Sequence, residues 1–287
     1  MTTVTLLHPG SMGAPLAAQA VEAGHRVLWV SDDRSHRTHG RAEKAGFTPC
    51  ESLNKALAAS EVVLSVCPPQ AAEDVAGAVA QHGFDGIYLD ANAISPQRMQ
   101  RIAAKMPADC SVLDGAIIGP PPAAGRTARL YLAGALSAMD VASGLFVGTS
   151  VHVREAGAGI GAASALKMSF ASFQKAARTL AGVSHALAEQ HGVADLLTEE
   201  AKAMTSEILS DPEYLPSVAA RAWRWAPEMG EVADALRGAA LPVEMAEATA
   251  SVLMRWEQDK DRTDLPLTVV LSHLRSDAPG TAQQRPM

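Results

Sequence analysis

The amino-acid sequence predicts an α/β protein with a doubly wound parallel sheet, followed by an all-α C-terminal domain. Three observations lead to this fold class. The apolar run 4–7 stops at a turn with two glycines, Gly10-Ser11-Met12-Gly13, and helical spacing follows it. Short apolar runs then alternate with helical patterns up to about residue 114. From Ala194 to Leu274 the chain is dense in Ala, Leu, Met and Glu and lacks the alternation of a strand.

Charge and cysteine content indicate which partners to expect. The chain has 287 residues and a formal net charge of −7, with its acidic residues interspersed, so no basic face is offered to nucleic acid or to an anionic membrane. We therefore expect a small-molecule substrate, no nucleic acid and no membrane. Cys50, Cys67 and Cys110 form no C-x-x-C pair, which argues against a disulfide framework and a zinc site. Without a recognisable signal peptide, the expected location is cytoplasmic.

The turn at residues 10–13 is the first candidate functional element. In the dinucleotide-binding pattern G-x-G-x-x-G, Gly10 and Gly13 fill the last two positions, while His8 stands at the first. Glycine there lets the backbone approach a pyrophosphate in front of a helix N-terminus. We expect Gly10, Ser11, Met12 and Gly13 to bind a dinucleotide. The alternative is an ordinary strand-to-helix turn.

The segment that leaves the second expected strand is placed to contact the adenosine ribose of such a ligand. Arg34, Ser35 and Arg37 combine positive charge with a hydroxyl group, which suits the 2′-phosphate of NADP. Asp32 or Asp33 would instead accept a hydrogen bond from the bare ribose of NAD. We favour NADP (NADPH) over NAD, and a solvated charged loop is the remaining alternative.

The pattern also predicts the other elements of the first domain. We expect helices over 14–24, 41–45, 53–59, 72–81 and 96–106, and strands over 4–7, 25–30, around Phe47, and over 62–66, 86–90 and 111–114. Ligands of such sheets lie beyond the carboxyl ends of the strands. Cys67, Pro68, Pro69 and Asn92 are therefore candidate cofactor-binding residues, and 115–122 is a further candidate site loop.

The second half begins at a glycine hinge, Gly157-x-Gly159-x-Gly161, and continues as a helix expected over 160–191. A helix of ~30 residues is about 45 Å long, more than a small domain is wide, so we expect part of it to pack against a second subunit. The partner prediction is a homodimer formed through the C-terminal helical domain. We place an NAD(P)-binding domain at 1–156, a helical substrate and dimerisation domain at 157–274, and a disordered tail at 275–287.

Several of these segments carry a family resemblance. At segments 10–13, 34–35, 67–69, 90–96 and 114–119 the chain resembles the β-hydroxyacid dehydrogenase and 6-phosphogluconate dehydrogenase-like superfamily, over about residues 3–270 in all. Around Ala165-Leu166-Lys167-Met168 it resembles that superfamily's NAD(P)-dependent oxidoreductases with a phosphogluconate-dehydrogenase-like C-terminal domain. The resemblance implies a Rossmann-like first domain and hydride transfer with a nicotinamide cofactor.

The resemblance also implies a catalytic residue. Lys167 stands in an apolar helical stretch at the position of the family's catalytic lysine. A protonated lysine can donate to a developing alkoxide, or withdraw that proton in the reverse reaction. A lysine that only extends its ammonium group to solvent is the structural alternative.

The sequence departs from the family pattern near this lysine. Typical members carry Ser-Gly-Gly to hold a substrate carboxylate, whereas this chain has Ile118-Gly119-Pro120. Ala171 stands where they place an asparagine, and Phe170 precedes it. We therefore expect a more apolar pocket than that of a hydroxyacid enzyme.

The remaining candidates are polar or aromatic. Asn92 stands where the family has Ser-Thr, and it could bond the nicotinamide ribose or a substrate. The cluster Trp223-Arg224-Trp225 is either a wall of the substrate site or core packing. We expect no metal site, because no His-Glu spacing supports one. The candidate substrate residues are Asn92, Ile118, Gly119, Pro120, Phe170, Gln174 and Trp223.

These observations favour an NADPH-dependent oxidoreductase that transfers a hydride between the nicotinamide and a small carbonyl or alcohol substrate, with Lys167 as general acid/base. An imine reductase is the second candidate, although an iminium already carries its proton and has less need of a lysine acid. A non-catalytic NADP-binding regulatory protein is the third, and the missing serine and asparagine are its best support.

Overall fold

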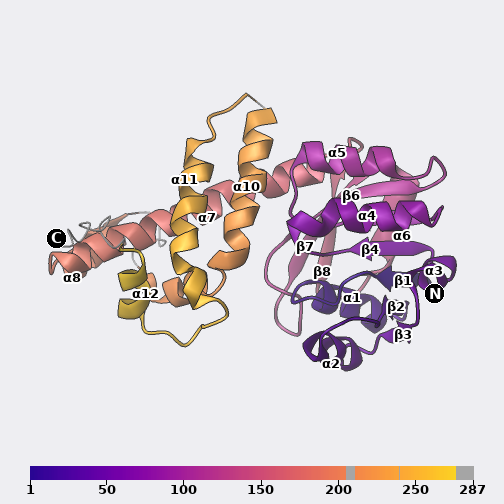
Figure 1. Ribbon diagram of the computed structural model, residues 1–287, viewed down its shortest axis with the longest axis horizontal. Helices are drawn as coiled ribbons and strands as arrows, with labels where there is room; N and C mark the ends of the chain where they lie inside the picture. Colours follow the sequence, from indigo (N-terminus) through magenta and orange to yellow (C-terminus); the bar gives the residue numbers. More distant parts are fainter. Residues whose placement is uncertain (205–210, 239, 276–287) are drawn as a thin grey trace, which may run out of the picture. The chain divides into compact units, whose positions relative to one another are not determined.

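The computed structural model describes residues 1–204, 211–238 and 240–275 (Figure 1). The chain forms two units, Met1–Ser169 and Phe170–Met287, and each is described by itself. The division falls within a long helix, whereas the sequence analysis placed the domain boundary at 156/157. Apart from Arg275, the tail expected at 275–287 lies outside the described residues.

The first unit contains one eight-stranded sheet in the order β3-β2-β1-β4-β5-β6-β7-β8. All neighbouring strands are parallel except β6 and β7, which are antiparallel. The strands are β1 (Thr3–Leu6), β2 (Arg26–Val30), β3 (Thr48–Cys50), β4 (Val62–Ser65), β5 (Ile87–Asp90), β6 (Ser111–Ile118), β7 (Ala128–Gly134) and β8 (Val151–Gly157). The mostly parallel sheet confirms the expected fold class.

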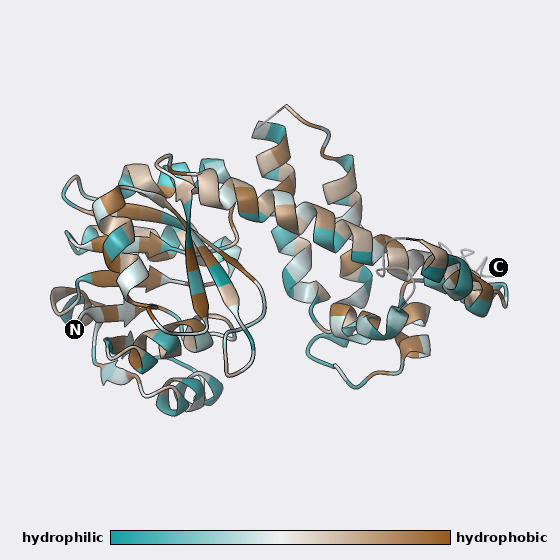
Figure 2. Ribbon diagram, turned by 180° about the vertical axis from the view of Figure 1, so that it is seen from behind, coloured by the Kyte–Doolittle hydropathy of each residue, from teal (hydrophilic) through white to brown (hydrophobic). Residues whose placement is uncertain are grey.

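Helices cover both faces of this sheet. They are α1 (Gly13–Glu22), α2 (His36–Lys44), α3 (Leu53–Ala58), the short 3₁₀ helix η1 (Pro69–Ala71), α4 (Ala72–Gln81), α5 (Pro96–Lys105) and α6 (Leu136–Gly144). Successive residues of β4 separate the two cores: Val62 and Leu64 pack with α1 and α6, whereas Val63 packs with α4 and α5. The central strands are accordingly apolar along most of their length, and much of the sheet is brown in Figure 2.

Two expectations about the first unit were wrong. The expected site loop 115–122 is strand as far as Ile118, because β6 continues beyond its parallel partner and pairs there with β7. The helix expected over 41–45 begins earlier, at His36, because the side chain of Ser35 accepts a hydrogen bond from Thr38 N and caps it.

Every secondary-structure element described in the second unit is a helix, as the sequence predicts. Its helices are α7 (Ala162–Gln190, whose first turns belong to the first unit), α8 (Ala194–Ala203), η2 (Pro212–Tyr214), α9 (Leu215–Ala219), α10 (Ala222–Gly238), α11 (Glu244–Leu253), η3 (Met254–Asp259) and α12 (Leu267–His273). Trp256 is fully buried and its Nε1 donates to Val270 O at 2.8 Å. In the described part of the chain, every helix is too short or too polar to traverse a lipid bilayer.

Candidate active site

The glycine turn between β1 and α1 has the geometry of a phosphate cradle. A Cβ on Gly13 would lie 2.6 Å from His8 O and 3.3 Å from Val66 Cβ, so only glycine allows α1 to pack this closely against β1 and β4. No side chain caps α1, whereas Ser35, Ser52 and Ser95 cap α2, α3 and α5. The uncapped N-terminus of α1 is therefore suited to an anionic ligand.

Basic side chains lie beside this turn. Arg41 on α2 donates from Nε to Pro9 O at 2.9 Å and so fixes the turn from outside, a role that the sequence analysis missed. His8 Nδ1 and Arg34 Nε are buried without a hydrogen-bond partner among the described residues. Burial and the charge of Arg34 lower the pKa of His8 to about 4, so its imidazole is neutral at pH 7.

These residues fit a dinucleotide with a phosphorylated ribose. Arg34 brings a guanidinium group to the carboxyl end of β2, and two unsatisfied buried nitrogens beside the turn indicate an incomplete polar environment. Ser35 is less available than the sequence suggested, because its Oγ lies 3.0 Å from Thr38 Oγ1 and 3.3 Å from Thr38 N. In this structure Ser35 caps α2, and its contact with a phosphate stays a prediction.

Asn92 joins the carboxyl ends of β4 and β5. Its Oδ1 accepts from Cys67 N at 2.6 Å, and its Nδ2 donates to Ser65 Oγ at 3.1 Å and to Asp90 Oδ2 at 3.0 Å. Both amide hydrogens are thus used inside the protein, and Asn92 is 3% exposed. To donate to a ribose or a substrate it would have to exchange one of these bonds. In this structure it positions the two strand ends.

The carboxyl group beneath Asn92 is strongly perturbed. Asp90 is fully buried, and burial raises its pKa to about 7, against the opposing hydrogen bonds from Asn92. Asp114, its register partner on β6, raises it further. Burial also raises the pKa of Cys67 to about 12, so this thiol is not a nucleophile at neutral pH. Pro68 is exposed and Pro69 begins η1.

Asp114 holds the beginning of α7. Its carboxylate, with no exposed surface, accepts from Gly161 N at 2.9 Å, from Ser164 N at 3.0 Å and from Ser164 Oγ at 2.6 Å. Gly161 has φ +105°, and a Cβ there would lie 3.2 Å from Pro96 Cβ. The first turn of α7 is therefore satisfied by a distant carboxylate on β6. In the sequence, the Gly161-x-x-Ser164 spacing is the feature that could have indicated this helix start.

Lys167 lies one turn further along α7 and returns to the same strand. Its Nζ donates to Ile117 O at 3.0 Å, next to Ile118 at the end of β6. Ile118 is 4% exposed, whereas Gly119 and Pro120 are exposed and begin the β6–β7 loop. The half-buried ammonium group of Lys167 is thus held at the carboxyl end of β6. The glycine turn follows the carboxyl end of β1, at the same end of the parallel strands.

Three predicted substrate residues belong to the second unit. Phe170 and Trp223 are each more than a third exposed, and Gln174 is half-buried. Lys260 Nζ lies 4.0 Å from the centroid of the Trp223 ring. The assignment of these three residues to a substrate site stays a prediction.

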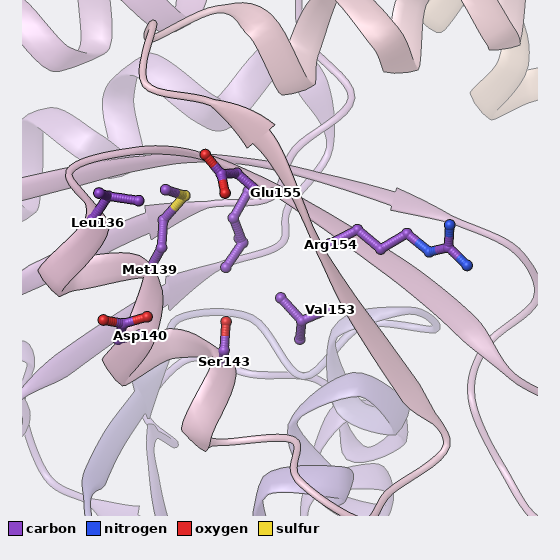
Figure 3. Close-up of a pocket in the computed structure, with 8 residues that line it drawn as sticks. Leu136, Met139, Asp140, Ser143, Val153, Arg154 and Glu155 are labelled. Carbon is purple, nitrogen blue, oxygen red and sulfur yellow. The ribbon is translucent and has the colours of Figure 1, made fainter.

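A hollow of about 130 Å³ lies elsewhere in the first unit, between α6 and the edge strand β8 (Figure 3). It contains none of the predicted site residues. Met139 and Ser143 of α6 face Val153 of β8 across it, whereas the Arg154 side chain extends away from α6. Among the described residues, no group of three or more His, Cys, Asp or Glu side chains is placed to hold a metal ion.

Comparison with known protein families shows which family the chain belongs to. Residues 3–153, more than half of the chain, match the family model of the NAD binding domain of 6-phosphogluconate dehydrogenase. The chain belongs to this family. Residues 188–256 also match a model described as a domain of unknown function (DUF1932). The first unit is accordingly an NAD binding domain of this family.

Solved structures share the fold over nearly the whole chain. A conserved protein of unknown function, noted for its similarity to 3-hydroxyacid dehydrogenases, is 26% identical with a TM-score of 0.67, covering 90% of this chain and 97% of that chain. Mycobacterium tuberculosis 3-hydroxyisobutyrate dehydrogenase with L-serine is 21% identical with a TM-score of 0.77, and the match covers 96% of this chain and 100% of that chain. A reductive aminase from Aspergillus terreus with NADPH and ethyl levulinate is 17% identical with a TM-score of 0.56, and the match covers 96% of this chain and 100% of that chain. A search of curated proteins finds no match.

Proposed function

We propose that this protein transfers a hydride between NADPH and a small carbonyl or alcohol substrate, with Lys167 as the general acid/base. The observation that carries the proposal is the position of Lys167. Its Nζ is 3.0 Å from Ile117 O, at the edge of the sheet where the family binds its cofactor. The backbone carbonyl accepts a hydrogen bond from the ammonium group and so fixes its direction.

The chemistry balances with one residue and one cofactor. The bound nicotinamide supplies a hydride, which adds to the carbonyl carbon while the C=O π bond breaks. Lys167 gives one proton to the resulting alkoxide and becomes a neutral amine, which regains a proton from solvent. In the reverse direction, neutral Lys167 takes the hydroxyl proton. Asp114 keeps the lysine in place by holding the first turn of α7.

The preference for NADPH is part of the proposal. Arg34 supports it because its guanidinium lies beside the glycine turn and is not neutralised by a carboxylate within ion-pair distance among the described residues. Arg41 adds positive charge while it fixes Pro9. The neutral His8 favours neither cofactor by charge.

An imine is the alternative substrate. Ala171, 1% exposed, stands where a hydroxyacid enzyme is expected to carry an asparagine, and a reductive aminase shares the fold. The lysine favours the carbonyl, because a neutral carbonyl oxygen needs a proton that an iminium nitrogen already has.

The decisive experiment is a panel of carbonyl and imine substrates monitored by NADPH oxidation, with parent protein and Lys167→Met. Methionine keeps much of the apolar stem and removes the proton donor. We expect turnover of the accepted carbonyl to fall by about 10²–10⁴-fold with an unchanged dissociation constant for NADPH. Lys202→Met, an exposed lysine on α8, is the matched control and should retain parental activity. Near-parental activity of Lys167→Met on a carbonyl would contradict the role, and imine turnover alone would select the alternative.

The homodimer is also a proposal. Phe173 and Leu180 of α7 are 71% and 52% exposed, and they lie seven residues apart, on one side of the helix. A soluble protein rarely leaves such side chains uncovered in one patch, and a second copy of the chain would cover them.

A further inference from the structure

Four basic side chains of the second unit gather around two aromatic rings. Lys175 Nζ and Arg221 Cζ lie 5.4 Å and 5.3 Å from the centroid of Trp225, and Arg178 Cζ lies 5.8 Å from that of Tyr214. Arg224 is close enough to Arg221 to disfavour its charge. These side chains come from α7 and from the segment that enters α10, elements that are close in Figure 1.

Two of the four have acidic neighbours. Lys175, 4% exposed, forms an ion pair with the buried Glu228, with Nζ and Oε1 2.5 Å apart. Arg224 experiences the negative charges of Glu228 and Asp261. Glu228 is therefore already committed to neutralising Lys175, and it is shared with Arg224.

Arg178 and Arg221 are different. Among the described residues, no carboxylate lies within ion-pair distance of either. Arg221 donates from Nε to Ser217 O at 2.7 Å and also bonds Ser217 Oγ, and Arg178 donates from Nη1 to Gln174 O at 3.2 Å. Burial and the charges of Arg224 and Arg178 together lower the pKa of Arg221. Two half-buried guanidinium groups thus repel each other without a counter-ion.

Two neighbouring guanidinium groups at half-buried positions are unfavourable unless an anion binds between them. Like charges at half-buried positions lower stability, and their concentration in one place is characteristic of anion-binding sites. Guanidinium groups are planar forks that match the two oxygens of a carboxylate or a phosphate. Burial raises the pKa of Tyr214, beside Arg178, to about 12, so its hydroxyl keeps its proton at neutral pH.

We propose that Arg178 and Arg221, with Tyr214 and Trp225 as their aromatic supports, form a binding site for an oxyanion group of a small ligand, a phosphate or a carboxylate. Glu228 and Asp261 offset the charges of Lys175 and Arg224, so Arg178 and Arg221 are the two side chains that the site uses for the anion. The site goes beyond the proposed hydride transfer and does not rest on it, because binding alone tests it.

The experiment is calorimetric titration of the full chain with inorganic phosphate and, separately, with acetate. The two arms distinguish a phosphate site from a carboxylate site. We expect one of them to bind, with an affinity that falls as salt is added and that drops at least ten-fold in Arg178→Gln and in Arg221→Gln. Arg237→Gln is the matched control, because this exposed arginine of α10 already pairs with Asp234 and Glu247.

Two further variants remove ambiguity. Arg34→Gln identifies phosphate bound at the glycine turn of the first unit, and it should leave the second site unchanged. If Arg221→Gln does not fold, Arg178→Gln decides the matter, because among the described residues the Arg178 guanidinium donates only to Gln174 O of its own helix. The proposal is overturned if neither anion binds at millimolar concentration, or if binding survives in both Arg178→Gln and Arg221→Gln.

Discussion

In the first unit the buried carboxyl groups Asp90 and Asp114 lie at the end of β5 and within β6 and bond to backbone and amide groups, whereas in the second unit the buried Lys175 and Glu228 lie on two helices and pair with each other. Asp114 is satisfied by the first turn of α7, and Asp90 by Asn92. Lys175 depends on Glu228. The start of α7 and the loop after β5 supply backbone N–H groups to these two carboxylates, whereas the N–H groups along the middle of a helix are already bonded within it, so Lys175 and Glu228 use each other's side chains.

The two units also differ in what they leave exposed. Most of the large apolar side chains that are more than a third exposed belong to the second unit: Phe170, Phe173, Leu180, Val193, Leu196, Met204, Trp223, Leu241, Met245 and Met254. The first unit contributes chiefly α6 and its neighbourhood, at Leu136, Val141 and Val147. The first unit thus closes its own core, while the second is suited to being covered by another surface.

The largest effect is expected from removing the carboxylate that joins β6 to α7. Asp114→Ala leaves two N–H groups and the Ser164 hydroxyl without their acceptor in a buried place. At about 1–3 kcal/mol for each unsatisfied group, the unfolding free energy measured in urea should fall by about 3 kcal/mol or more. Asp234→Ala is the control in the second unit. Its carboxylate is exposed and pairs only with surface Arg237, so the change should stay within about 0.5 kcal/mol.

Equal losses in these two variants would remove the distinction drawn between the units. A small loss in Asp114→Ala alone would mean that water replaces the carboxylate at the start of α7. Asp114→Asn keeps one acceptor oxygen and should recover part of the loss.

The next largest effect concerns the exposed apolar surface. Phe173→Asp introduces a charge where the proposed dimer needs an apolar contact, and the dimer dissociation constant from light scattering should rise by about 100-fold or more. Val147→Asp is the matched change in the first unit, since Val147 is 75% exposed and Phe173 is 71% exposed. Val147→Asp should leave the dimer intact. A parent protein that is monomeric at micromolar concentration, or a dimer indifferent to Phe173→Asp, would refute the interface.

The sequence predicted what local pattern determines. The apolar runs of β1, β2, β4 and β5, the Ser95-Pro96 start of α5 and Gly192 after α7 placed these elements within a few residues of their observed bounds. It did not predict β7 or β8. β7 has only the short run Leu130-Tyr131-Leu132 between Arg129 and the Ala and Gly residues at its end, and β8 is an edge strand with His, Arg and Glu, so neither carries a long apolar run.

The candidate site divides in the same way. The glycine turn and Lys167 were found from short motifs and resemblance. The bonds from Asp114 to Ser164 and from Arg41 to Pro9 join residues 50 and 32 positions apart, and no local pattern specifies such pairs. The interpretation of Asn92 as a ligand contact failed to anticipate that neighbouring strand ends use both of its amide hydrogens. The sequence pattern places a polar residue such as Asn92 after the carboxyl end of a strand. Only the folded structure determines which groups its N–H donors reach.

A third prediction separates the anion sites of the two units. Arg34→Ala should weaken NADPH binding by about 10- to 100-fold, the value of a charge-assisted hydrogen bond, and should leave NADH binding unchanged. Arg221→Gln, in the second unit, should change neither constant. Fluorescence titration with both cofactors measures all four quantities. If Arg34→Ala weakens NADH as much as NADPH, Arg34 supports the turn and does not read the 2′-phosphate.

The last expected effect is a pH dependence that belongs to the first unit alone. An unfolded aspartate titrates near pH 3.9, whereas burial raises the pKa of Asp90 to about 7 in the folded protein. Between these values the folded chain holds a proton that the unfolded chain has released. The contribution of Asp90 to the unfolding free energy therefore falls as pH rises from about 4 to about 7, by at most about 1.4 kcal/mol per pH unit, and is constant above that range.

Asp90→Asn has no such proton, so its stability in urea should depend less steeply on pH across this window than that of the parent, while Asp234→Asn should follow the parent. Only the slopes are compared, because an amide also alters the bonds to Asn92 and Tyr88 at every pH. Parallel profiles for the parent and Asp90→Asn would show that Asp90 is ionised when folded, and that the hydrogen bonds of Asn92 outweigh its burial.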